Sequence, residues 1–390
     1  MEKKRKKLIL TIVGGLILYF ASTGISYAAF RYLAGPVAIG PVSPLPGVGE
    51  GLRVDLSAPK TEKCPLNGGM FTEDERKIWE KRRPLTVMIE NHAEARPQSG
   101  LSFADVVYEV VAEGGITRFL AVFYCGGSAQ DVIIGPVRSA RTYFLDFASE
   151  YGDYPLYAHV GGANMPGPAD ALGQIGGYGW VAKGNDLNQF SIGFPAFWRD
   201  YERIGHTVAT EHTMFSTIDK LWEVAHKRGL DAEDDEGNKW DEDFISWQFK
   251  DEADFSERGE VAKIDFDFWS GYQEYAVSWQ YDREANLYRR SSGDQSHRDL
   301  NNDQQLQAKV VAVLFMSQKG PIDELKHLLY GTTGEGEAIV FQDGQAIEGS
   351  WKKAKRQSRT KFFDNRGKEI ALNGGKIWIE VLPIGNKVSY

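Results

Sequence analysis

Three arginines in a short stretch of the chain are the residues best suited to binding an anion. Arg118 follows a glycine turn, and Arg138 and Arg141 lie at an expected junction between a strand and a helix. Helix N-termini attract anions, and guanidinium groups bind phosphate or carboxylate through paired hydrogen bonds. The alternative is a structural network in which Arg138 and Arg141 pair with Asp105, Glu109 or Glu113. The predicted ligand-binding residues of this region are Arg118, Arg138, Ser139 and Arg141.

His159 completes this predicted site, because it ends an expected strand next to two glycines and a histidine there can act as a base or a ligand. Other histidines near strand ends are His92, His206 and His212. The sequence has no H-E-x-x-H and no H-x-H pair, so no pattern typical of zinc is present. Ser139 lacks a G-x-S-x-G context and Cys125 lacks a basic neighbour, so we assign no catalytic residue.

Asp105 and Glu109 are the candidate metal ligands. They stand four residues apart on an expected strand, so their side chains should share one face of the sheet. Carboxylate oxygens suit a hard cation such as Mg²⁺. If the protein only binds an anion at the arginines, it needs no cofactor. If it is an enzyme, Mg²⁺ would be bound by Asp105 and Glu109.

Strands and helices alternate irregularly before residue 260. Glu113-Gly114-Gly115 predicts a tight hairpin turn, and Ser216 can cap the clearest helix. The expected strands are 85–90, 106–111, 116–124, 133–134 and 156–160, and the expected helices are 141–151 and 216–228. This mixture indicates an α+β or α/β domain over residues 63–260.

The pattern after about residue 262 is almost entirely that of strands. Asp343-Gly344 is a strong hairpin signal between two of them. The expected strands are 276–281, 287–290, 310–316, 338–341, 346–351 and 377–382. We therefore expect a smaller, mostly β domain over residues 262–390, either a sandwich or a partly open barrel.

The N-terminal 30 residues predict a membrane location. Residues 8–30 are uncharged and follow five basic residues, which should stay in the cytoplasm and leave the bulk of the chain extracytoplasmic. A single-pass signal anchor is favoured by the length of this run. A cleaved signal peptide is the alternative, because residues 26–28 fit the small-x-small cleavage pattern. Residues 31–62 are rich in proline and glycine and predict a linker.

Composition limits the partners of the folded part. The net charge of −9 argues against nucleic-acid binding, which needs a basic surface. Two cysteines, Cys64 and Cys125, exclude a disulfide-dense scaffold and a four-cysteine zinc site. A disulfide between them and two free thiols are both consistent with the sequence.

Long motifs in both halves resemble the YerB-like family of bacterial envelope lipoproteins. The matching segments are 83–91, 96–101, 104–109, 113–119, 135–141, 279–282, 297 with 299, 336–338, 343–344 with 349–351, and 367–370. The resemblance implies a two-domain extracytoplasmic protein and assigns no biochemical function. This chain has no cysteine directly after its hydrophobic segment, so it departs from the lipid-anchored members, and this departure supports a protein anchor.

A second resemblance concerns the order of motifs. Residues 104–105, 141–143 and 157–162 follow the order seen in LytR–CpsA–Psr phosphotransferases, which transfer glycopolymers from polyprenyl pyrophosphate to the cell wall. The resemblance implies Asp105 as a Mg²⁺ ligand, and Arg141 with Arg138 as a clamp for pyrophosphate. A second aspartate expected after the arginine is missing.

Three functions follow from these observations. The first is a membrane-anchored envelope protein that binds an anionic ligand, either an anionic glycan or a polyprenyl-pyrophosphate lipid. The second is a Mg²⁺-dependent phosphotransferase or hydrolase acting on lipid-linked pyrophosphate glycans. The third is a non-catalytic envelope scaffold. The sequence identifies no protein partner.

Overall fold

The computed structural model describes residues 54–390. The predicted membrane segment 1–30 and the first part of the predicted linker lie outside these residues. Among residues 54–390, no helix is both long enough and apolar enough to cross a bilayer.

Most regular structure in the described part of the chain is β, and the helices are short. The α-helices are α2 (Glu73–Trp79), α3 (Thr142–Ala148), α4 (Ala171–Gly177), α5 (Trp180–Lys183), α6 (Gln189–Ile192) and α7 (Ile218–Lys227). Single 3₁₀ turns are η1 (Ala93–Ala95), η2 (Leu101–Phe103), η3 (Thr210–His212), η4 (Phe255–Glu257) and η5 (Gln273–Tyr275).

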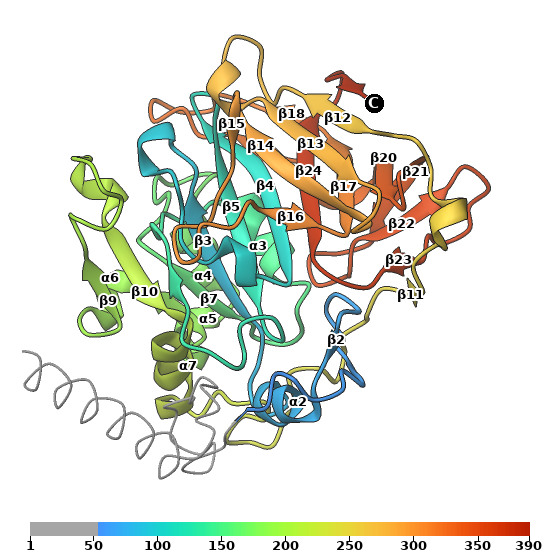
Figure 1. Cartoon of the computed structure of the whole chain (residues 1–390). Helices are drawn as coiled ribbons and strands as arrows, with labels where there is room; N and C mark the ends of the chain where they lie inside the picture. Colours follow the sequence, from blue (N-terminus) through green and yellow to red (C-terminus); the bar gives the residue numbers. More distant parts are fainter. Residues whose placement is uncertain (1–53) are drawn as a thin grey trace, which may run out of the picture. The chain divides into compact units, whose positions relative to one another are not determined.

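One ten-stranded mixed sheet runs through both halves of the sequence (Figure 1). Its order is β22-β21-β20-β17-β24-β4-β5-β3-β7-β8. These strands are β3 (Leu85–Glu90), β4 (Val106–Glu113), β5 (Ile116–Phe123), β7 (Leu156–His159), β8 (Asp186–Asn188), β17 (Val310–Met316), β20 (Gly334–Gln342), β21 (Gln345–Lys353), β22 (Lys361–Asp364) and β24 (Ile377–Pro383). The parallel pairing of β24 with β4 joins the two halves.

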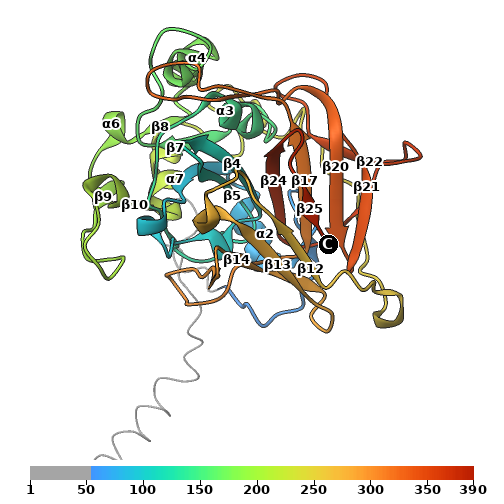
Figure 2. The same ribbon diagram turned by 90° about the horizontal axis from the view of Figure 1, so that it is seen from above.

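A second, six-stranded sheet packs on one face of the first. It contains β12 (Lys263–Phe266), β13 (Val277–Asp282), β14 (Leu287–Ser292), β15 (Gln295–Ser296), β16 (Gln307–Ala308) and β25 (Val388–Ser389). Trp279 of β13 meets Trp378 of β24 edge to face, with ring centroids 5.3 Å apart. On the opposite face of the large sheet, Phe147 of α3 stacks on Tyr108 of β4. Figure 2 shows these three layers.

The remaining strands form small pairings around this framework. They are β1 (Glu62–Lys63), β2 (Met70–Phe71), β6 (Ile133–Ile134), β9 (Phe197–Arg199), β10 (Met214–Thr217), β11 (Phe249–Lys250), β18 (Gln318–Lys319), β19 (Leu329–Tyr330) and β23 (Leu372–Asn373). Of these, β6, β10 and β9 make a three-stranded sheet.

Both predicted hairpin turns are present. Gly114 and Gly115 join β4 to β5, and both have positive φ angles. Asp343 and Gly344 join β20 to β21 in the same way. Two consecutive residues with positive φ form the hairpin turn that matches the twist of its strands, so these short sequences set the register of their hairpins.

The predicted N-cap of the 216–228 helix is wrong by one residue. The helix is α7, and its cap is Thr217, whose hydroxyl accepts a hydrogen bond from the backbone amide of Lys220 at 3.2 Å. Ser216 belongs to β10, where its hydroxyl donates to the carbonyl of Ala196. The strand therefore continues to the residue that starts the helix.

The fold class is partly as expected. Both halves contain the predicted strands, but the helices are shorter and fewer than an α/β domain would have. Within the described residues, the C-terminal strands do not close a separate sandwich or barrel. Several of them extend the large sheet, because the last long strand, β24, inserts between β17 and β4.

Candidate functional site

Two glutamates hold the three predicted arginines in one cluster. Arg138 forms an ion pair with Glu90, and Arg141 forms one with Glu113. Nη2 of Arg118 lies 3.5 Å from the carboxylate of Glu113. We call these five residues the arginine cluster. The sequence analysis considered a structural network of ion pairs as the alternative to a ligand site. The pair between Arg141 and Glu113 agrees with that alternative, whereas the partner of Arg138 is Glu90.

Three neighbouring strands of the large sheet and the segment between β6 and α3 bring the arginine cluster together. Arg118 lies on β5, directly opposite Glu90 on the neighbouring strand β3. Arg138 follows β6 and donates its backbone amide to the carbonyl of Met88 on β3. Arg141 is the N-cap residue of α3, although its side chain makes no capping bond. The large sheet therefore sets the spacing of the charges.

The arginine cluster carries more positive than negative charge. Burial, and then the neighbouring charge of Arg141, lower the pKa of Arg118 to about 10. Burial acts to raise the pKa of Glu113, but the charges of Arg118 and Arg141 outweigh burial and lower it. Three guanidinium groups thus face two ionised carboxylates, and Nε of Arg118 has no hydrogen-bond partner among the described residues. An anion would balance this excess.

Solvent reaches one side of the arginine cluster. The side chains of Arg138 and Arg141 are 24% and 12% exposed, whereas that of Arg118 is buried. Two strongly exposed aromatic side chains lie in the segment after β8, Phe190 at 76% exposure and Phe194 at 83%. A Cβ added at Gly161 would lie 3.0 Å from the Phe190 ring, so that ring covers the loop after β7.

Ser139 and His159 lie beside the arginine cluster, but their polar atoms already have protein partners. The hydroxyl of Ser139 donates to the carbonyl of Val160 at 2.9 Å. The ring nitrogens of His159 contact the carbonyl of Gly161 and the carboxylate of Asp186, both at 2.6 Å. Their partners Val160 and Gly161 follow β7, and His159 is buried. Both residues therefore support the loop after β7.

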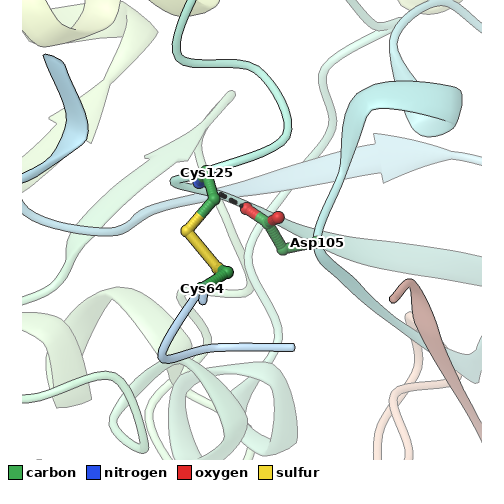
Figure 3. A group of neighbouring side chains, drawn as sticks. All are labelled: Cys64, Asp105 and Cys125. Carbon is green, nitrogen blue, oxygen red and sulfur yellow. Dashed lines mark hydrogen bonds between the residues drawn. A yellow bond between two sulfur atoms is a disulfide. The ribbon is translucent and has the colours of Figure 1, made fainter. Parts of the chain in front are cut away.

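Asp105 lies outside the arginine cluster and organises a turn. Figure 3 shows its carboxylate beside Cys125. Its carboxylate accepts hydrogen bonds at 2.7–2.9 Å from the backbone amides of Tyr124, Cys125 and Gly126, and from the side chain of Asn67. Cys125 is bonded to Cys64 in a disulfide, which decides between the two alternatives for the cysteines. With four donors on its two oxygens, Asp105 has little capacity left for a metal ion.

Glu109 has a different set of partners from Asp105. Its carboxylate accepts from Arg290 of β14 at 2.5 Å and from Thr117 at 2.6 Å. Asn91 donates to the same carboxylate at 3.1 Å. The two predicted metal ligands therefore do not act together, and Glu109 instead links the two sheets.

The buried ion pair between Glu109 and Arg290 is a feature that the sequence analysis missed. Both side chains are fully buried, and the guanidinium of Arg290 lies 5.2 Å from the ring centre of Trp378. Burial, and then the neighbouring charge of Glu109, raise the pKa of Glu380 well above its usual value. The sequence did contain a signal for this buried polar contact. Glu380 lies inside the apolar run of residues 377–382, and a buried glutamate needs a buried partner.

Fold and sequence together define the class of this protein. Residues 69–231 match the family described as "Protein of unknown function (DUF3048) N-terminal domain", and residues 264–379 match the corresponding C-terminal domain. The chain belongs to this YerB-like family, as the motifs indicated. The two matched regions contribute strands to the same large sheet.

A particular relative supports the assignment. YerB of Bacillus subtilis (strain 168), described as a candidate lipoprotein, is 29% identical over 326 residues, which cover 83% of this chain and 87% of that protein. A crystal structure of YerB from Bacillus subtilis superposes with a TM-score of 0.66 at 27% identity, and the match covers 85% of this chain and all of the other. In the present chain, both cysteines are used in the disulfide.

Proposed function

We propose that this protein is an extracytoplasmic envelope protein that binds an anionic ligand at the arginine cluster. The preferred ligand carries a phosphate-rich or carboxylate-rich group, as in a polyprenyl-pyrophosphate lipid or an anionic glycan. The observation that carries the proposal is the excess of three arginines over two glutamates on a partly exposed face.

Two exposed aromatic residues suggest that the ligand also has an apolar or sugar part. Phe190 and Phe194 present apolar rings to solvent, and aromatic rings pack against sugars and aliphatic chains. A ligand with an anionic head and an apolar or glycan body would use both features. Two other aromatic residues between β7 and β10, Trp180 and Phe197, are buried and belong to the core.

Two observations support a location outside the cytoplasm. The disulfide between Cys64 and Cys125 is typical of an oxidising compartment. The relative YerB is described as a candidate lipoprotein, which would place that protein on a membrane. In the present chain, the uncharged residues 8–30 are the proposed attachment to the membrane.

Thermal unfolding with and without ligand tests the proposal. The full chain in detergent is melted with inorganic pyrophosphate, and separately with a polyprenyl pyrophosphate. A ligand at a hundred times its dissociation constant adds about 2.7 kcal/mol of stability, which shifts the melting temperature by a measurable amount. We expect a shift that disappears in the double variant Arg138→Ala/Arg141→Ala.

The matched control is Arg289→Ala/Arg298→Ala, which removes two other ion-paired arginines with larger exposure. This control should keep the full ligand-induced shift. An equal loss in both double variants would mean that the anion acts only through general charge. If the cluster variant folds and keeps the whole shift, the proposed site is wrong.

A turnover assay, together with the same melting experiment, separates the other two functions. A Mg²⁺-dependent transferase or hydrolase would show turnover of the lipid pyrophosphate that depends on Mg²⁺. A scaffold would show no shift with any anion, while Arg138→Ala would lower the melting temperature through loss of the ion pair with Glu90. The hydrogen bonds that fill the carboxylate of Asp105 make binding without turnover the better supported of these outcomes.

A further inference from the structure

Two histidines and a glutamate converge next to the arginine cluster, on its side toward η1 and η3. His92 follows β3, Glu94 lies in η1, and His212 ends η3. Each offers one ligand atom, and these atoms lie within 4.8 Å of one another. The rings of His92 and His212 are stacked with centroids 4.7 Å apart, and Nε2 of His212 lies 3.9 Å from the carboxylate of Glu94.

Glu90 fixes the orientation of His212. Nδ1 of His212 lies 3.1 Å from Oε2 of Glu90, and the same oxygen pairs with Arg138. A histidine that donates from Nδ1 to a carboxylate presents the lone pair of Nε2 to a metal ion, and such carboxylate partners are common behind metal-binding histidines. The side chain of His212 is buried, so this orientation is held by packing as well.

We propose that His92, Glu94 and His212 form a binding site for a divalent transition-metal ion of the zinc type. Imidazole nitrogens suit Zn²⁺, and two histidines with one carboxylate make a common set of protein ligands for zinc. Three protein ligands leave a position for water or another oxygen ligand. The three proposed ligands are not members of the arginine cluster, and the two sites are linked through Glu90, which contacts both His212 and Arg138.

The side chains must move to close around an ion. The ring of His92 has to turn out of its stack on His212, because the lone pairs of two parallel, stacked rings do not meet at one point. Ligand atoms of a tetrahedral zinc lie about 3.3 Å apart, somewhat closer than the present spacing. Glu94 has a carboxylate that is 60% exposed and free to turn. His92 must give up the 3.2 Å hydrogen bond that its Nδ1 accepts from the backbone amide of Glu94, because a metal-bound imidazole has no second free lone pair. That bond is exposed to solvent, so its loss is a small obstacle.

Zinc binding to the full chain tests this proposal directly. The protein is purified in detergent without a histidine tag and with its disulfide intact, so that neither a tag nor free thiols contribute. Bound zinc is measured by mass spectrometry after equilibrium dialysis, and affinity is measured by competition with a chromophoric chelator. We expect a single equivalent of zinc, and a Co²⁺ derivative with the visible absorption of a low-coordinate nitrogen and oxygen site.

Variants at the two more accessible ligands locate the ion without disturbing the core. His92→Ala and Glu94→Gln should each weaken zinc binding by about tenfold or more. His226→Ala is the matched control, since His226 is exposed and pairs with Asp231 in a different part of the chain. Zinc binding by the wild type that is unchanged in both ligand variants would overturn the proposal, as would the absence of stoichiometric binding. Pyrophosphate-induced stabilisation in the presence of a chelator reports on the anion site separately.

Discussion

At the scale of single residues, Asp105 illustrates how a buried carboxylate can organise a turn. Three consecutive backbone amides, those of residues 124–126, donate to it. Gly126 must be a glycine there, because a Cβ would lie 2.6 Å from the carbonyl oxygen of Phe103. The carboxylate thus fixes the segment that carries Cys125.

Lys376 lies near Asp105 and gives a prediction about pH. Its ammonium donates to the carbonyl of Leu101, and burial lowers its pKa to about 8, with Asp299 and Asp105 opposing this shift. In the unfolded chain, the ammonium has its ordinary pKa of 10.5. Between about pH 8 and 10.5 the unfolded chain therefore keeps the proton, whereas the folded chain loses it. The contribution of Lys376 to stability should therefore rise as the pH rises from about 8 to 10.5, by at most about 1.4 kcal/mol per pH unit.

Urea denaturation of the wild type and of Lys376→Met over this range checks the prediction. The methionine variant cannot titrate at this position, so the wild type should gain stability relative to it as the pH increases. A difference that stays constant with pH would mean that Lys376 has an ordinary pKa in the folded state.

At the scale of elements, the disulfide fastens the first described segment to the end of β5. It joins Cys64, which follows β1, to Cys125, which follows β5, across a sequence separation of 61 residues. A cross-link stabilises a protein mainly by limiting the unfolded chain, and the effect grows with the length of the loop. Among the described strands, β1 and β2 pair only with each other.

The double variant Cys64→Ala/Cys125→Ala should lose about 4 kcal/mol of unfolding free energy, the value expected for a loop of this length. Guanidinium denaturation measures the loss. Reductant should destabilise the wild type by a similar amount and leave the variant unaffected. A variant as stable as the oxidised wild type would show that the disulfide adds nothing to the fold.

At the scale of the whole molecule, a buried ion pair ties the two sheets together. Arg290 of the six-stranded sheet reaches Glu109 of the ten-stranded sheet, and Trp279 of the former donates to Glu380 of the latter at 2.9 Å. Removing one partner of such a pair leaves a buried charge without compensation. The relative position of the sheets therefore depends on polar contacts as well as on apolar packing.

Arg290→Met should lower the unfolding free energy by about 3–5 kcal/mol, because Glu109 would remain buried without its cation. The double variant Arg290→Met/Glu109→Gln should recover part of this loss. Arg289→Met is the control, since the neighbouring side chain is 41% exposed and its change should cost no more than about 0.5 kcal/mol. Equal effects of the two arginine variants in chemical denaturation would contradict the proposed role of the pair.

Local sequence determined much of the secondary structure. The strands 85–90 and 310–316 have the predicted bounds, and the turns 114–115 and 343–344 join the predicted hairpins. These features depend on residues close together in the chain, where apolar runs and the φ preferences of glycine and aspartate act directly. The long motifs in the sequence also indicated the family, and the family models confirmed it.

The surroundings of the candidate residues were decided by tertiary structure. The sequence singled out Arg118, Arg138 and Arg141, but their partner Glu90 and the neighbouring His212 come from segments about 120 residues apart. Asp105 directly precedes β4 and Glu109 lies on it, yet contacts with the residues that follow β5 and with β14 give them separate roles. Strand order, the insertion of β24 beside β4, and the disulfide all depend on contacts between distant residues, and no local pattern encodes which distant segment a side chain will meet.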